Sequence, residues 1–197
     1  MENRLIAVRL SAQQLSDPRF DDPRALVRWM GAVQAQDYKA VRWAVGIRLR
    51  TASLRAVDRA LERGEILRTH VMRPTWHLVA AEDIRWMLRL SARRIRSANS
   101  SLARSRGLGI DDGMYSRSNR LIEKMLRGNL CLTKRQIADR FQAAGIAADT
   151  HFMTRYLMRA EADGIVCSGP DRAGQFTYAL LEERVAPVPA VSYTHLR

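Results

Sequence analysis

The chain has 197 residues, of which 47% are hydrophobic and 27% are charged, a composition typical of a soluble globular protein with one large or two small domains. No run approaches the ~20 apolar residues of a membrane helix, and the N-terminus lacks a secretory signal, so we expect a cytoplasmic protein without a membrane partner. Only two cysteines, Cys131 and Cys167, are present and they form no CxxC pair, which argues against a disulfide framework.

The net charge is +13 and the sequence pI is about 11.0, which favours a polyanionic partner such as nucleic acid. A GC-rich coding sequence would also inflate the arginine content, but it would do so throughout the chain. Here the charge is concentrated, because residues 81–128 carry 11 basic and 5 acidic side chains, whereas residues 129–197 carry 8 and 7. The uneven distribution favours a local nucleic-acid-binding surface.

The first eighty residues predict helices followed by a β-hairpin. Apolar and polar residues alternate loosely over residues 1–10, so this segment could form either a short strand or an extended arm. Asp22-Pro23 is typical of a helix start. The spacing then predicts, in order, a helical stripe through Leu26, Met30 and Val33, helices over 39–47 and 53–64, and strands over 65–71 and 75–80. This order is that of a winged helix-turn-helix, so we take residues 1–80 as a first unit.

Residues 81–107 predict one long helix that follows without a linker. Its arginines Arg85, Arg89, Arg93 and Arg96 fall at i, i+4, i+8 and i+11, which places them on one stripe. No acidic residue occurs between Ile84 and Ile110 to neutralise this stripe. A solvated face is the simpler interpretation, but we expect the stripe to contact DNA phosphates without reading sequence.

The same order of elements recurs over residues 108–185, after a glycine-containing linker at 105–113. The pattern predicts helices over 114–127, from Thr133 to Gly145 and from Asp149 onward, a short strand at 130–132, and hairpin strands at 165–168 and 175–180. The expected fold is therefore mainly α with short β-hairpins, in tandem winged helix-turn-helix units. We expect Arg155 and Arg159 on the exposed side of the last helix, and Arg172 at the hairpin tip, as further DNA contacts. We expect residues 186–197 to be a linker or truncation tail.

Polar residues Gln34, Gln36 and Asp37 interrupt the apolar spacing after the first predicted helix. On an ideal helix the two glutamines would point about 200° apart. We therefore expect them where the helix ends, with both amides turned toward one small volume. Two surface or helix-capping amides are the alternative interpretation.

Two sequence blocks resemble those of a known family. They are GAVQAQDYKAVRWAVGIRLR at 31–50 and ILRTHVMRPTWHLVAAEDIRWML at 66–88. Together they resemble the bacterial winged-helix DNA glycosylases that unhook interstrand crosslinks, the family of the azinomycin-resistance glycosylase. The resemblance covers about residues 5 to 185 and implies that Gln34 and Gln36 are the catalytic pair. Family members usually continue into a third winged helix and a C-terminal β-domain, which implies that this chain corresponds to the N-terminal part of such an enzyme.

An amide pair suits the chemistry that this resemblance implies. An N7- or N3-alkylated purine is already cationic and leaves readily, so the enzyme mainly has to position a water and stabilise charge. Amide oxygens can accept hydrogen bonds from that water, and the amide NH₂ groups can hold sugar or phosphate oxygens. We therefore predict a monofunctional DNA glycosylase that excises alkylated purines and unhooks crosslinks, with double-stranded, damaged DNA as its partner.

The sequence also predicts roles for other residues near the two blocks. We expect Asp37 to cap the following helix, with ordering of the water as the alternative. His77 is expected to be a structural histidine, with a substrate hydrogen bond as the alternative, and Arg68 and Arg73 are expected to contact phosphates. The four tryptophans have spacings that favour the core: Trp29, Trp43, Trp76 and Trp86.

Two other classes of function suit the same composition. A non-catalytic winged-helix regulator would need the same fold and charge, and a protein-interaction scaffold could use the arginine helix on an acidic partner. His70 and His77 have no cysteine or third histidine nearby, so we expect no metal site and no cofactor. We expect a monomer associated with the nucleoid.

Overall fold

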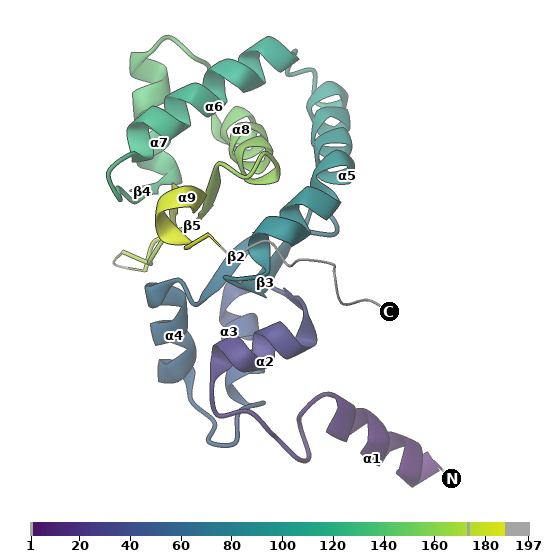
Figure 1. Ribbon diagram of the computed structural model, residues 1–197. Coiled ribbons are helices and arrows are strands. Elements are labelled where there is room, and N and C mark those ends of the chain that lie inside the picture. The colour runs from purple at the N-terminus through teal and green to yellow at the C-terminus, as the bar shows by residue number, and fades with distance from the viewer. Residues whose placement is uncertain (1, 173, 188–197) are drawn as a thin grey trace, which may run out of the picture.

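The first half of the chain combines helices with a three-stranded antiparallel sheet, in the lower part of Figure 1. The computed structural model describes residues 2–172 and 174–187. The elements are α1 (Glu2–Ala12), α2 (Pro23–Met30), β1 (Val33–Gln34), α3 (Tyr38–Gly46), α4 (Leu54–Arg63), β2 (Ile66–His70) and β3 (Trp76–Ala80). The strand order is β1–β3–β2, and one face of this sheet shares a core with α2, α3 and α4. Residues 1–10, left open between strand and arm, lie mostly in α1.

Local sequence signals set the ends of these helices. The Asp22 carboxylate accepts a hydrogen bond from the Ala25 amide at 2.9 Å, and Pro23 occupies the first turn of α2. The Ser53 hydroxyl accepts from the Ala56 amide at 3.1 Å at the start of α4. Gly64 ends α4 at a φ of 73°, a left-handed conformation that glycine adopts without a steric penalty. The helices predicted over 39–47 and 53–64 and the predicted hairpin are confirmed, whereas the helix predicted through Val33 ends at Met30.

The second half repeats the order of helix, short strand, two helices and hairpin. Its elements are α5 (Ile84–Ser105), α6 (Asp112–Leu126), β4 (Leu132–Thr133), α7 (Lys134–Ala143), α8 (Thr150–Ala162), β5 (Val166–Ser168), β6 (Thr177–Leu180) and α9 (Leu181–Arg184). The sheet order is β4–β6–β5. Thr133 and Gln136 form the predicted capping box at α7. The described fold is thus mainly helical with small antiparallel sheets, as predicted. Most of the predicted tail at 186–197 lies outside the described residues.

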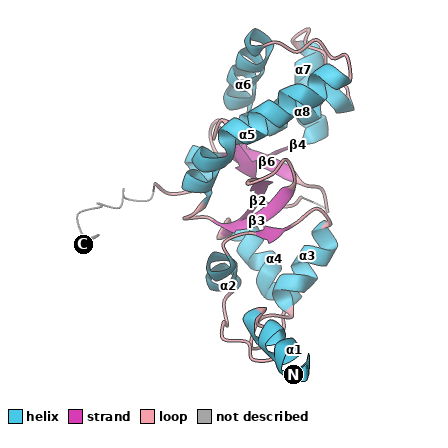
Figure 2. Ribbon diagram, turned by 90° about the vertical axis from the view of Figure 1, so that its right-hand side faces the viewer, coloured by secondary structure: helices cyan, strands magenta, loops and turns pink. Residues whose placement is uncertain are grey.

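The two halves meet through their sheets and through the long helix α5. Figure 2 shows the strands in the middle of the molecule, with helices of the first half below and those of the second half above. A shared core joins Leu67 and Val79 of the first sheet to Met87 of α5 and Cys167 of β5. At the edge of β2 the Arg68 amide donates a hydrogen bond to the Ser168 hydroxyl at 2.9 Å. The two halves are therefore packed against each other and are not joined by a linker alone.

Candidate active site and nucleic-acid interface

Strand β1 places Gln34 and Gln36 on the same side of the chain. Gln34 pairs with His77 on β3, and the Ala35 amide donates to the Trp76 carbonyl at 2.7 Å, so the backbone is extended here. Side chains alternate along an extended chain. Ala35 is accordingly buried in the first core, whereas Gln34 and Gln36 are both exposed. The expectation of a helix end at the glutamines is therefore wrong, because α2 stops at Met30, Gln34 ends the short strand β1, and Gln36 follows two residues later.

Two groups beside the glutamines have structural roles. The Asp37 carboxylate accepts from the Ala40 amide at 2.9 Å and caps α3, as the cap interpretation predicted. His77 is buried, and its Nδ1 lies 2.9 Å from the Thr75 carbonyl oxygen. Burial lowers the pKa of His77, the hydrogen bond to Thr75 opposes this in part, and the charge of Arg73 adds a smaller lowering. His77 is thus the neutral, structural histidine that we expected.

The side chain of Arg68 leaves β2 on the face of the sheet opposite to the face that carries Gln34. Its Nε and Nη2 both donate to the Ala35 carbonyl oxygen, at 3.0 and 2.8 Å. Arg73, by contrast, is exposed in the connection between β2 and β3. Of the two hairpin arginines predicted to contact phosphate, only Arg73 is thus fully presented to solvent.

The predicted arginine stripe on α5 is divided between the fold and the solvent. Arg85 donates to the Val185 carbonyl at 2.9 Å, and Arg96 donates to Asp163 at 2.6 Å, both in the second half. Arg89 and Arg93 are exposed and make no ion pair with the described residues. No acidic residue of α5 neutralises the stripe, but Asp163 at the C-terminal end of α8 pairs with Arg96. The prediction of one unpaired stripe of four is therefore wrong.

A different exposed surface on α5 was not singled out from the sequence. Arg93, Arg94, Ser97 and Ser101 border a shallow groove with Leu90, whose exposed fraction of 78% is the largest among the exposed large hydrophobic residues. The helix periodicity alone could have grouped these residues. The sequence did not reveal which face of α5 packs against the second half, and the exposed face depends on that packing.

The two arginines expected on the exposed side of α8 are not there. Arg155 is buried, with a residue exposure of 9%, because α8 packs between α5, α6 and the sheets. Arg159 pairs with Asp163 at 2.9 Å and with Asp112 at 3.2 Å. Neither guanidinium is available to a duplex in this arrangement, so the expectation is wrong. Arg172, between β5 and β6, is exposed as predicted.

Three of the four tryptophans do not belong to the core. Trp29 on α2, Trp43 on α3 and Trp86 on α5 have exposed fractions of 51%, 58% and 46%. Only Trp76 packs against the cores of both halves, as expected. Exposed indole rings can stack on nucleobases or sugars. They therefore add to the surface that could contact a nucleic acid.

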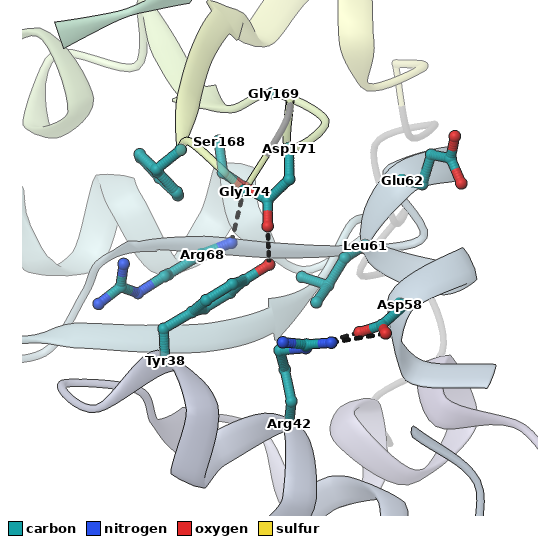
Figure 3. A pocket seen from close by; sticks show the side chains of 11 residues that line it. Tyr38, Arg42, Asp58, Leu61, Glu62, Arg68, Ser168, Gly169, Asp171 and Gly174 are labelled. Atoms are coloured by element: carbon teal, nitrogen blue, oxygen red, sulfur yellow. Dashed lines mark hydrogen bonds and ion pairs between the residues drawn. The ribbon is translucent and has the colours of Figure 1, made fainter. Parts of the chain in front are cut away.

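A polar cleft of about 370 Å³ lies between the two halves (Figure 3). Tyr38 reaches across it and donates to the Asp171 carboxylate at 2.8 Å, while Arg42 and Asp58 form an ion pair at 2.6 Å. Burial raises the pKa of Tyr38, and the contact with Asp171 raises it further. Arg42, Asp58 and Asp171 are thus already paired within the cleft. The glutamines do not line it.

None of the described helices has the length and hydropathy needed to span a bilayer. Within residues 2–172 and 174–187, no group of three or more histidine, cysteine, aspartate or glutamate side chains gathers into a metal site.

The chain is similar to known proteins in both sequence and fold. The profile of a family described as "DNA glycosylase AlkZ-like" matches residues 27–196. The solved structure of Streptomyces sahachiroi DNA glycosylase AlkZ superposes with a TM-score of 0.72 at 21% sequence identity, over 92% of this chain and 50% of that one. The chain therefore spans half the length of that structure, and the likeness at this identity shows the fold. Among curated proteins, no match was found.

Proposed function

Because the chain belongs to the AlkZ-like DNA glycosylase family, we propose that it hydrolyses the N-glycosidic bond of N-alkylated purines in duplex DNA, with Gln34 and Gln36 as the catalytic pair. One observation carries the proposal. Ala35 anchors the extended segment in the core, while Gln34 and Gln36 on either side of it are exposed, and the Gln36 Oε1 accepts from the Trp76 amide at 3.4 Å. Two amides that flank one extended residue can address the same sugar.

The amide pair would act by position and polarity. An alkylated purine is cationic and departs with its bonding electrons, leaving an oxocarbenium-like sugar that a water attacks at C1′. The Gln34 and Gln36 carbonyl oxygens would accept hydrogen bonds from that water, and their NH₂ groups would hold sugar or phosphate oxygens. A glutamine amide is not a general acid and cannot protonate a leaving base, so intact purines, whose departure needs protonation, would be spared.

The DNA duplex would be held mainly by arginines on the exposed surface. Arg89, Arg93 and Arg94 on α5, Arg73 in the first hairpin and Arg172 in the second are exposed and have no ion-pair partner among the described residues. Contacts of this kind position DNA and do not read its sequence. The repeated order of elements supports two winged helix-turn-helix units over 1–80 and 108–185, joined by the helix at 81–107. Unhooking of interstrand crosslinks, action as a monomer and a place at the cytoplasmic nucleoid belong to the same proposal.

The test is excision of N7-methylguanine from a duplex, scored as abasic sites. The wild-type chain is compared with the Gln34→Ala/Gln36→Ala double variant and with Gln142→Ala, an exposed glutamine on α7. We expect the double variant to lose excision while it retains DNA affinity, and Gln142→Ala to behave as wild type. Excision that survives in the double variant would overturn the catalytic assignment. Binding without excision by the wild type would indicate a non-catalytic regulator instead.

A further inference from the structure

We propose that Arg68 is the positioning residue of the glutamine pair, an inference that rests on the proposed function of Gln34 and Gln36. Strand β1 is short, and its ladder with β3 ends at the hydrogen bond from the Ala35 amide to Trp76. The Ala35 carbonyl, which lies between the two glutamines, instead accepts from Nε and Nη2 of Arg68 at 3.0 and 2.8 Å. Nη2 also reaches the Gln36 carbonyl at 3.3 Å. Arg68 thus fixes the main chain that carries both amides.

The guanidinium of Arg68 is itself tightly located. Its Cζ lies 4.5 Å from the Trp76 ring centroid, 5.3 Å from that of Tyr38 and 5.4 Å from that of Phe176. No carboxylate in the described part of the chain pairs with it, and burial lowers the pKa of Arg68. Carbonyl oxygens and aromatic faces therefore hold the cation. A planar guanidinium fits this arrangement, and the point charge of a lysine does not.

The second half of the chain supplies part of this environment. The Ser168 hydroxyl on β5 accepts from the Arg68 amide at 2.9 Å, and Phe176 provides one of the three rings. Asp171 holds the hydroxyl of Tyr38, a second ring, at 2.8 Å. Figure 3 shows Arg68, Tyr38, Ser168 and Asp171 together at the cleft between the halves. The geometry of the glutamine pair is therefore linked to the packing of the β5–β6 hairpin.

The experiment compares Arg68→Lys with Arg127→Lys, a matched change at a largely exposed arginine of the second half that pairs with Glu123. Single-turnover excision, DNA affinity across a salt series and thermal unfolding are measured for each. We expect Arg68→Lys to slow excision on the order of 100-fold, the cost of misplacing a reacting group by about 1 Å. DNA affinity and its salt dependence should stay at the wild-type values, as should all properties of Arg127→Lys.

The opposite results would overturn the positioning role. A loss of DNA affinity in Arg68→Lys that accounts for the loss of excision would indicate a phosphate contact, and an unchanged excision rate would leave no role in positioning. If Arg68→Lys does not fold, Phe176→Leu tests the same role, because it removes one of the three rings around the Arg68 guanidinium. This variant is expected to slow excision without a change in DNA affinity. An unchanged rate in that variant would equally overturn the role.

A second readout separates this inference from the proposed function. Amide hydrogen exchange and the side-chain NH₂ resonances of Gln34 and Gln36 report their order without any catalysis. If the wild type excises nothing, the proposed function fails, yet faster exchange at residues 34–37 in Arg68→Lys, relative to α8, would still support positioning. Unchanged exchange and unchanged resonances would overturn it.

Discussion

His70 at the end of β2 and Glu161 on α8 form a buried side-chain hydrogen bond across the junction of the two halves. The two residues are 91 positions apart in the sequence, and Glu161 has no exposed surface. The His70 ring also lies against Trp76, with centroids 3.9 Å apart. Oε1 of Glu161 has no hydrogen-bond partner among the described residues, so His70 provides the one polar contact of this carboxylate. This buried pair thus adds a polar contact to an interface that a shared apolar core and the Arg68–Ser168 and Tyr38–Asp171 hydrogen bonds also hold together.

Replacement of Glu161 by alanine should strongly destabilise the protein. Removal of the carboxylate leaves the buried Nδ1 of His70 without its hydrogen-bond partner, and an unsatisfied buried polar group typically costs about 1–3 kcal/mol of unfolding free energy. Glu123→Ala, which removes the exposed partner of Arg127, should cost less than about 1 kcal/mol. Urea denaturation of both variants gives the comparison, and similar losses at the two positions would refute the structural importance of the His70–Glu161 pair.

Variants of Asp37 should separate helix capping from catalysis. Asp37→Asn and Asp37→Ser keep a side-chain acceptor for the Ala40 amide, whereas Asp37→Ala loses it and should cost about 1 kcal/mol. If capping is the role of Asp37, the asparagine and serine variants retain both stability and excision. A loss of excision in Asp37→Asn at unchanged stability would show that the carboxylate orders the water instead.

His77 should make stability depend on pH near neutrality. Burial lowers the pKa of His77 in the folded protein, whereas the unfolded chain has the ordinary value of about 6.5. The unfolded state therefore binds more protons as the pH falls below about 6.5, so stability is full above that value and decreases until the folded-state pKa is passed. His77→Gln should flatten this decrease in denaturation curves recorded between about pH 5 and 8. An unchanged slope would contradict a neutral, buried imidazole.

The sequence predicted the features that depend on neighbouring residues. The caps at Asp22, Ser53 and Thr133 are contacts within three residues, so residue type and spacing identify them. The two hairpins followed from turn and strand signals in the same way. The two-residue strand β1 was missed because it is defined by pairing with β3, more than forty residues later. An extended backbone at Gln34 is a tertiary effect, and the helical spacing before it gave no sign of it.

The same limit applies to the charged residues of the site. Arg96 has no acidic neighbour in its own helix, yet Asp163 pairs with it after the chain has folded back. Arg155 has the spacing of an exposed helical face but is buried, because α8 packs on several sides. Charge along a helix predicts which residues could be presented to DNA. Only the packing of the helix determines which of them are.

DNA binding should distinguish the exposed arginines of α5 from the paired ones. Arg93→Ala, Arg94→Ala and Arg96→Ala each remove one positive charge from the same helix, so their long-range electrostatic effects are equal. Arg93 and Arg94 border the exposed groove, whereas Arg96 is held by Asp163, which also binds Arg159 and Asn119. Each of the first two variants should lower the slope of log affinity against log salt by about 1, and Arg96→Ala should change it much less. Equal slopes for all three would mean that the duplex binds elsewhere and senses only the net charge of the chain.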